Sequence, residues 1–255
     1  MASHHKHQQR GAAATAPGAL PVINIGRLGD KDPAARALVV QDIARACRDR
    51  GCFQVVNHGV SKSAMDDALE AASEFFDMPA ERKAAFACAD IRSPVRYDTS
   101  SKDGISKARS FLKHYANPLD HWVDSWPTQP ATYRKKMGTY AVEIQRLSIQ
   151  LMGAIVQGLG LCPMHLQEKL GAGLQFMALN NYPQGASRAG DTERISIASI
   201  HGAAIDEKVG CAEELVDERH PRMYRESSFH DFLDFLPTNV KAYRRFVETL
   251  KIDSA

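Results

Sequence analysis

Two strand-like runs within residues 175–200 decide the fold of this chain: QFMALN at 175–180 and RISIASI at 194–200. Ile recurs at alternate positions of the second run, and β-branched residues favour extended structure, while the first run is mainly apolar and includes Phe176. In an extended strand, residues two apart share a face, so Arg194 and Ser196 are expected to point the same way, as are Asn180 and Tyr182. The connection at 184–193, QGASRAGDTE, contains no His. It therefore offers no imidazole ligand for a metal between the two strands.

The rest of the chain is mainly helical in its patterning. Helices are predicted from Asp32 to about Arg50, from Ser61 to Phe76 and from Ala131 to Gly158, where apolar residues recur at intervals of three and four. Further strands are predicted at 20–25 and 52–58, whereas the polar stretch 89–104 is predicted to be loop. About four strands can be identified in all, whereas a jelly roll needs about eight. The sequence thus predicts an α+β chain with a short supply of strands.

Composition limits the class of protein. The chain has 255 residues, of which 44% are hydrophobic and 24% charged, as in soluble globular proteins. A net charge of +2 with scattered basic residues argues against nucleic-acid binding. No apolar run reaches the roughly 20 residues that span a bilayer. Five irregularly spaced cysteines indicate reduced thiols and a cytoplasmic protein.

Motifs of other common enzyme classes are absent from the sequence: it has no G-x-S-x-G, P-loop, G-x-G-x-x-G or kinase set. It also has no H-x-D or H-x-E pair. An improvised metal site would have to draw on histidines and aspartates that follow Arg194, namely His201, His220, His230, Asp206, Asp217 and Asp231. The alternative interpretation is that these histidines lie on the surface or have ordinary hydrogen-bond partners. We favour this second interpretation, because the residues are spread along the chain without metal-ligand spacing.

Several segments resemble the plant 2-oxoglutarate/Fe(II)-dependent dioxygenases. The most specific is ARACRDRGCFQVVNHGV at 44–60, and LPVIN at 20–24 and FFDMPAERK at 75–83 resemble neighbouring signatures of the family. Asn180-Asn181-Tyr182-Pro183 and Arg194-Ile195-Ser196 resemble landmarks of its catalytic domain, and residues 211–221 with Tyr224-Arg225 resemble the tail that follows the jelly roll. The flavanone 3-hydroxylase-like, flavonoid branch looks nearest. The composition of residues 1–19, rich in Ala, His, Gln and Gly, predicts a disordered tail. The resemblance implies a mainly helical N-terminal domain at 20–170, and at 171–255 a truncated double-stranded β-helix, or jelly-roll, remnant with C-terminal helices.

The resemblance also implies a chemistry. The family binds Fe(II) through a 2-His-1-carboxylate triad and oxidises small metabolites with 2-oxoglutarate as cosubstrate. By resemblance, Arg194 and Ser196 bind the far carboxylate of 2-oxoglutarate, and Asn180 and Tyr182 also contact it. The family's iron ligands lie between these two motifs, where this chain has only 184–193. We therefore predict no catalytic and no metal-binding residues, and a catalytically inactive chain.

Three functional hypotheses follow. The first is an inactive dioxygenase of flavonoid-like ancestry, arising as a splice product, a truncated gene copy or an edited gene model. The second is a non-enzymatic module that binds a protein partner, for which the apolar stripe of the 131–158 helix would be available. The third is an active dioxygenase with an improvised metal site. The expected small-molecule partner of the family is an aromatic metabolite.

Overall fold

The computed structural model describes residues 19–100, 109–164, 166–184, 192–239 and 245–252. The tail predicted for residues 1–19 thus lies, except for Ala19, outside the described residues. The strands are β1 (Val22–Asn24), β2 (Gln54–Val56), β3 (Val95–Ser100), β4 (Arg109–Asn117), β5 (Gln175–Tyr182) and β6 (Arg194–His201). The α-helices are α1 (Pro33–Arg50), α2 (Lys62–Phe76), α3 (Ala80–Ala84), α4 (Leu119–Trp122), α5 (Tyr133–Gly158), α6 (Gln167–Gly171), α7 (Phe229–Asn239) and α8 (Phe246–Thr249). Short 3-10 helices are η1 (Gly26–Gly29), η2 (Val123–Ser125) and η3 (Glu213–Leu215).

The N-terminal layer is built on α1, whose ends follow the local sequence. The Asp32 carboxylate accepts a hydrogen bond from the Ala34 amide, and Pro33 occupies the first helical turn. Gly51 ends the helix in the left-handed conformation, with φ of 70°. Parallel strands β1 and β2 lie beside this helix and share a hydrophobic core with α1 and the C-terminal half of α5.

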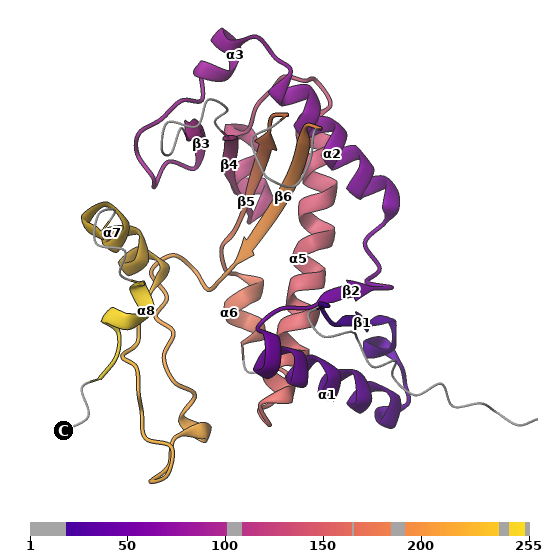
Figure 1. Ribbon diagram of the computed structural model, residues 1–255, viewed down its shortest axis with the longest axis vertical. Coiled ribbons are helices and arrows are strands. Elements are labelled where there is room, and N and C mark those ends of the chain that lie inside the picture. Colours follow the sequence, from indigo (N-terminus) through magenta and orange to yellow (C-terminus); the bar gives the residue numbers. More distant parts are fainter. Residues whose placement is uncertain (1–18, 101–108, 165, 185–191, 240–244, 253–255) are drawn as a thin grey trace, which may run out of the picture.

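The main sheet is antiparallel and has the strand order β3-β4-β5-β6 (Figure 1). Strands β3 and β4 were not predicted, because Val95–Ser100 falls in the predicted loop and no element was predicted for Arg109–Asn117. The prediction failed because the charged side chains Arg96, Asp98 and Lys113 lie on one face only, while Leu112 and His114 on the other face are fully buried. Strand β4 of the segment 20–170 pairs with β5 of the segment 171–255, so both segments contribute strands to one sheet.

Helices α2 and α5 cover one face of this sheet. Leu112, Met177 and Leu179 point into a core that includes Phe75 of α2 and Met137 of α5. The apolar stripe of α5 is therefore covered, with Tyr133 and Met137 buried and the remaining positions half-buried against α1, α2 and the sheet, and the expectation that it is available to a partner is wrong. Its burial follows from packing between α1, α2 and the sheet, which only the tertiary structure provides.

The opposite face of the sheet is covered only in part. Phe176 of β5 contacts Phe229 of α7, with ring centres 5.6 Å apart, and the aromatic contacts continue through Phe232 to Phe246. The C-terminal segment thus packs over one end of this face, beside the sheet in Figure 1. A mainly helical N-terminal part and a small antiparallel sheet agree with the α+β class expected from the sequence. No helix within the described ranges is long and apolar enough to cross a membrane.

Candidate functional site

The four residues expected to bind the cosubstrate lie together on β5 and β6. Tyr182 pairs directly with Arg194, and Asn180 pairs with Ser196, so two successive cross-strand pairs occupy one face of the sheet. The Arg194 guanidinium carbon lies 4.3 Å from the centre of the Tyr182 ring. Asn180 is only 7% exposed, and its amide donates to the Ala178 carbonyl at 3.0 Å. Arg194 itself is exposed.

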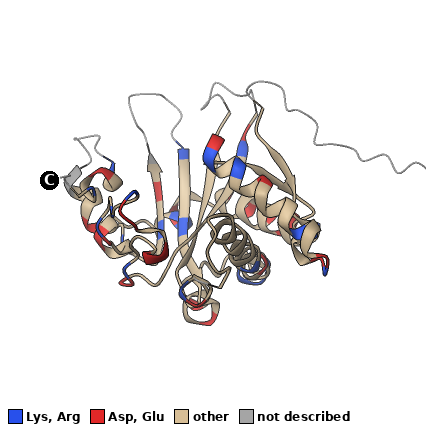
Figure 2. Cartoon of the chain, turned by 90° about the horizontal axis from the view of Figure 1, so that it is seen from below, with Lys and Arg blue, Asp and Glu red and all other residues tan. Residues whose placement is uncertain are grey.

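Basic and aromatic side chains continue across the same face. On β4, Lys113 lies over the rings of Tyr115 and Phe176, at 5.0 and 5.7 Å, and Arg109 lies over Phe111 at 5.3 Å. Burial, followed by repulsion from Arg96, lowers the Lys113 pKa to about 8. In Figure 2, basic and acidic residues are intermixed on the helices, and the strands of the sheet carry basic residues together with Asp98 of β3, which pairs with Arg96. The face therefore favours an anionic ligand with apolar parts.

His114 and His201 lie on the helix-covered face and serve packing. The buried His114 ring lies 2.9 Å from the Tyr133 hydroxyl and stacks near Trp126, with ring centres 4.3 Å apart. His201 bridges Ser199 at 2.9 Å and Gln145 at 2.7 Å. Burial lowers the pKa of each imidazole to about 4, so both are neutral at neutral pH.

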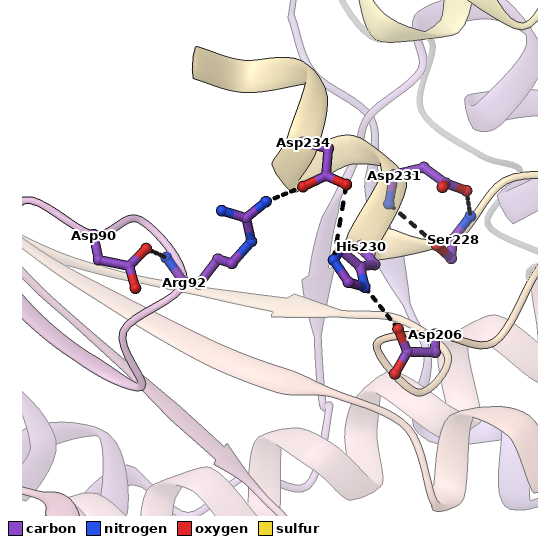
Figure 3. A network of polar contacts seen from close by, with 7 residues as sticks. All are labelled: Asp90, Arg92, Asp206, Ser228, His230, Asp231 and Asp234. Carbon is purple, nitrogen blue, oxygen red and sulfur yellow. Dashed lines mark hydrogen bonds and ion pairs between the residues drawn. The ribbon is translucent and has the colours of Figure 1, made fainter. Parts of the chain in front are cut away.

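The other two histidines after Arg194 each have carboxylate partners of their own. His220 contacts Asp217 at 3.0 Å in an exposed turn. His230 of α7 lies 2.8 Å from Asp206 and 3.8 Å from Asp234, and Asp234 also pairs with Arg92 (Figure 3). Asp231 instead caps α7, since its carboxylate accepts from the Ser228 amide at 2.8 Å. The contacts of Asp234 tie the C-terminal segment to the loop before β3.

Sequence reasoning missed this polar connection between α7 and the β3 loop. The spacing of His230 and Asp234, one helical turn apart, was a local signal for their contact. Arg92, far away in the sequence, gave no such signal.

Comparison with known proteins places these observations in a family. The model of the N-terminal domain of non-haem dioxygenases, described from morphine synthesis, matches residues 20–129. A 2-oxoglutarate-dependent dioxygenase 21 of Oryza sativa subsp. japonica is 51% identical, with 99% of this chain and 97% of the relative covered. The chain belongs to the 2-oxoglutarate-dependent dioxygenases. Flavanone 3-dioxygenase 3 of the same plant is 42% identical, with 92% and 94% covered.

Solved structures of dioxygenases share the fold of this one. The JOX2 structure in complex with 2OG, Fe and JA has a TM-score of 0.76 at 22% identity, and covers 91% of this chain and 89% of its own. The rice dioxygenase for auxin oxidation has a TM-score of 0.73 at 18% identity, with 92% and 100% covered. The expected α+β class with a jelly-roll remnant is confirmed, as are Fe(II) and 2-oxoglutarate as the cofactor and cosubstrate of the family.

The alignment with the 51% identical relative from rice has more positions than this chain has residues. It runs over 324 positions, whereas the chain has 255 residues, so about 70 positions have no residue here. Covering 99% of one chain and 97% of the other, the match leaves almost nothing unaligned at the ends. The alignment positions without a residue in this chain therefore lie inside the aligned region and not at its ends.

The residues of this dioxygenase do not fit the family's iron. The connection from Gln184 to Glu193 supplies no His, and no group of three His, Cys, Asp or Glu side chains suited to a metal occurs in the described parts of the chain. His201, His220 and His230 lie in separate environments and do not converge. The improvised triad considered from the sequence is therefore not formed by these residues.

The residues of this dioxygenase do fit a carboxylate. The planar Arg194 guanidinium lies over an aromatic ring, which orients it, and the fork of N–H donors suits bidentate binding. Within the described residues, no acidic side chain forms an ion pair with Arg194.

The expected cytoplasmic location needs correction. The 51% identical relative from rice is a chloroplastic enzyme, which conflicts with that expectation. Reduced cysteines gave no basis for choosing between compartments, because a thiol count reports redox conditions and not an address.

Proposed function

We propose that this dioxygenase-family chain binds 2-oxoglutarate, or a similar small dicarboxylate, through Arg194, Ser196, Asn180 and Tyr182, and does not catalyse oxidation. The observation that carries the proposal is the register of β5 and β6, in which Tyr182 is opposite Arg194 and Asn180 is opposite Ser196. The register brings two motifs that are separated in sequence onto one face of the sheet.

The chemistry of the four side chains supports dicarboxylate binding. Arg194 offers a charged, planar set of donors, and Ser196 adds a hydroxyl two residues away on the same face. Neighbouring basic residues on β4 raise the positive potential of this face. Asn180 is buried, which strengthens a polar contact at this position relative to water.

The loss of oxidation rests on the missing ligands. A facial triad needs two imidazoles and one carboxylate at one point, and β5 connects to β6 without a His. The internal difference of about 70 positions from the rice relative supports removal of a segment between these strands. We also propose that the ancestral substrate was a small aromatic, flavonoid-like metabolite, which the 42% identical flavanone 3-dioxygenase 3 supports.

Binding is tested by isothermal titration calorimetry of the full chain with 2-oxoglutarate, in the presence and absence of Mn(II). We expect binding that does not require the metal. The variant Arg194→Gln should weaken binding by about 10- to 100-fold, because hydrogen bonds to charged groups contribute about 1.5–3 kcal/mol. The matched control Arg219→Gln removes the same charge from an exposed turn and should bind normally. Equal affinities of both variants would overturn the proposed site.

Turnover is tested by measuring succinate formation from 2-oxoglutarate with Fe(II) and ascorbate present. We expect none above a protein-free control. Inserting the rice relative's additional segment between Pro183 and Arg194 should restore it if the lost segment is the cause. Succinate production by the unaltered chain would overturn the loss of catalysis while leaving cosubstrate binding intact.

A further inference from the structure

Strand β6 has one side of its backbone unpaired. It is the last strand in the order β3-β4-β5-β6 and pairs only with β5. Within the described residues, no other backbone group bonds to Arg194–His201. Alternate amides and carbonyls of an edge strand point outward, so this edge can accept another strand.

The opposite edge of the same sheet is protected. Tyr97 of β3 forms a bridge with Ala87, and its amide donates to the Phe86 carbonyl at 2.8 Å. Strand β3 also carries Arg96 and Asp98, which form an ion pair. Covering segments and charged side chains are the usual protection of a sheet edge against association.

Among the residues that the structure describes, no segment pairs with the outer side of β6, and the strand lacks charged residues after Arg194. Residues 195–200 read ISIASI and contain no charged residue and no Pro. Ala198 is exposed and Ile200 is 40% exposed, both on the face away from α2 and α5. A β-branched, uncharged and unpaired edge of this length is the kind of strand that pairs with another chain.

We propose that a second copy of this chain docks on β6, antiparallel to it, and extends the sheet across a two-fold axis. The antiparallel arrangement is favoured because it places the two Arg194 side chains at opposite ends of the strand pair, whereas a parallel one would bring them together. It also matches the uncharged centre of one copy with that of the other. A two-fold pairing uses the same edge in both copies and closes, so it stops at the dimer.

The dimer is tested by sedimentation velocity over a wide range of concentration, together with backbone amide hydrogen exchange. We expect a reversible monomer–dimer equilibrium, and slower exchange of amides in Arg194–His201 as the dimer forms. The variant Ala198→Lys places a charge on each β6 and should weaken dimerisation at least about tenfold, because the two like charges come close in the strand pair.

The control Thr99→Lys adds the same charge at an exposed position on β3, the other edge, and should leave the equilibrium unchanged. The proposal would be overturned if the chain stayed monomeric at every concentration. Pairing of β6 only with a strand of a different protein would overturn it as well. So would a dimer without slower exchange in β6, or growth into larger assemblies. The exchange experiment uses the unaltered chain, so the result does not depend on the folding of a variant. It is also independent of cosubstrate binding by Arg194.

Discussion

The Arg194 guanidinium lies over the Tyr182 ring, 4.3 Å from its centre, across the β5–β6 pair. The ring holds the charged group at one face of the sheet without neutralising it. Although Arg194 is exposed, this contact favours the rotamers that keep the guanidinium over the ring.

The first prediction concerns that ring. Tyr182→Leu should weaken 2-oxoglutarate binding about 2- to 5-fold, because an exposed cation–π contact is worth about 0.5–1 kcal/mol. Tyr182→Phe keeps the ring and should bind closer to the unaltered chain. Calorimetric titration of both variants checks this. Equal losses in the two would assign the role to the hydroxyl instead of the ring.

The second prediction concerns His114 and acid stability. Its folded pKa of about 4 lies below the unfolded value of 6.5, so the unfolded state binds more protons in between. The contribution of neutral His114 to the free energy of unfolding is fully present above pH 6.5. It is lost as pH falls towards 4, and its upper limit is about 3 kcal/mol. Urea unfolding as a function of pH checks it. His114→Gln should reduce the slope between pH 6.5 and 5 but leave the part due to His201, and an unchanged slope would contradict the assignment.

The third prediction concerns Lys113 and alkaline stability. Burial lowers its folded pKa to about 8 from 10.5, so the unfolded state again binds more protons between these values. The free energy of unfolding should therefore rise from pH 8 towards 10.5, by no more than about 2 kcal/mol after allowance for partial exposure. Lys113→Met should remove this rise in pH-dependent urea unfolding. A rise of the same size in the variant would implicate other groups.

The fourth prediction compares two glycines before β5. A Cβ on Gly173 would lie 2.1 Å from the Gly202 carbonyl oxygen and 2.5 Å from that of Lys169, whereas one on Gly171 meets nothing within 4 Å. Gly173→Ala should cost several kcal/mol, roughly 3 or more, because both obstacles are backbone atoms. Gly171→Ala should stay within about 1 kcal/mol of the unaltered chain. Urea denaturation of the pair checks this, and similar losses in both would contradict the close approach of the two backbones.

Local signals explain what could be predicted before the tertiary structure. Asp32 with Pro33 begins α1 and Gly51 ends it, as expected, because caps and left-handed turns depend on adjacent residues. The spacing of Arg194 and Ser196 predicted that both side chains lie on the same face, because side chains alternate between the two faces of any strand. Neither motif revealed its partner.

Non-local contacts explain what could not be predicted. Strand β3 lies in a polar stretch, and it became a strand because β4 supplies its backbone partners. The stripe of α5 was recognised as apolar, but its burial depended on three other elements. Asp206, which contacts His230, likewise comes from a loop outside α7 that reaches the histidine only on folding.

The sequence by itself determined the family, the helical N-terminal part, the two motifs and the absence of a His between them. These are properties of residue identity and short spacing, which survive without any fold. Only the tertiary structure decided that Tyr182 faces Arg194, that Asn180 faces Ser196, and that β6 is left as an unprotected edge. Strand register and sheet order depend on hydrogen bonds between distant segments and on which faces can be buried, and no local pattern contains that information.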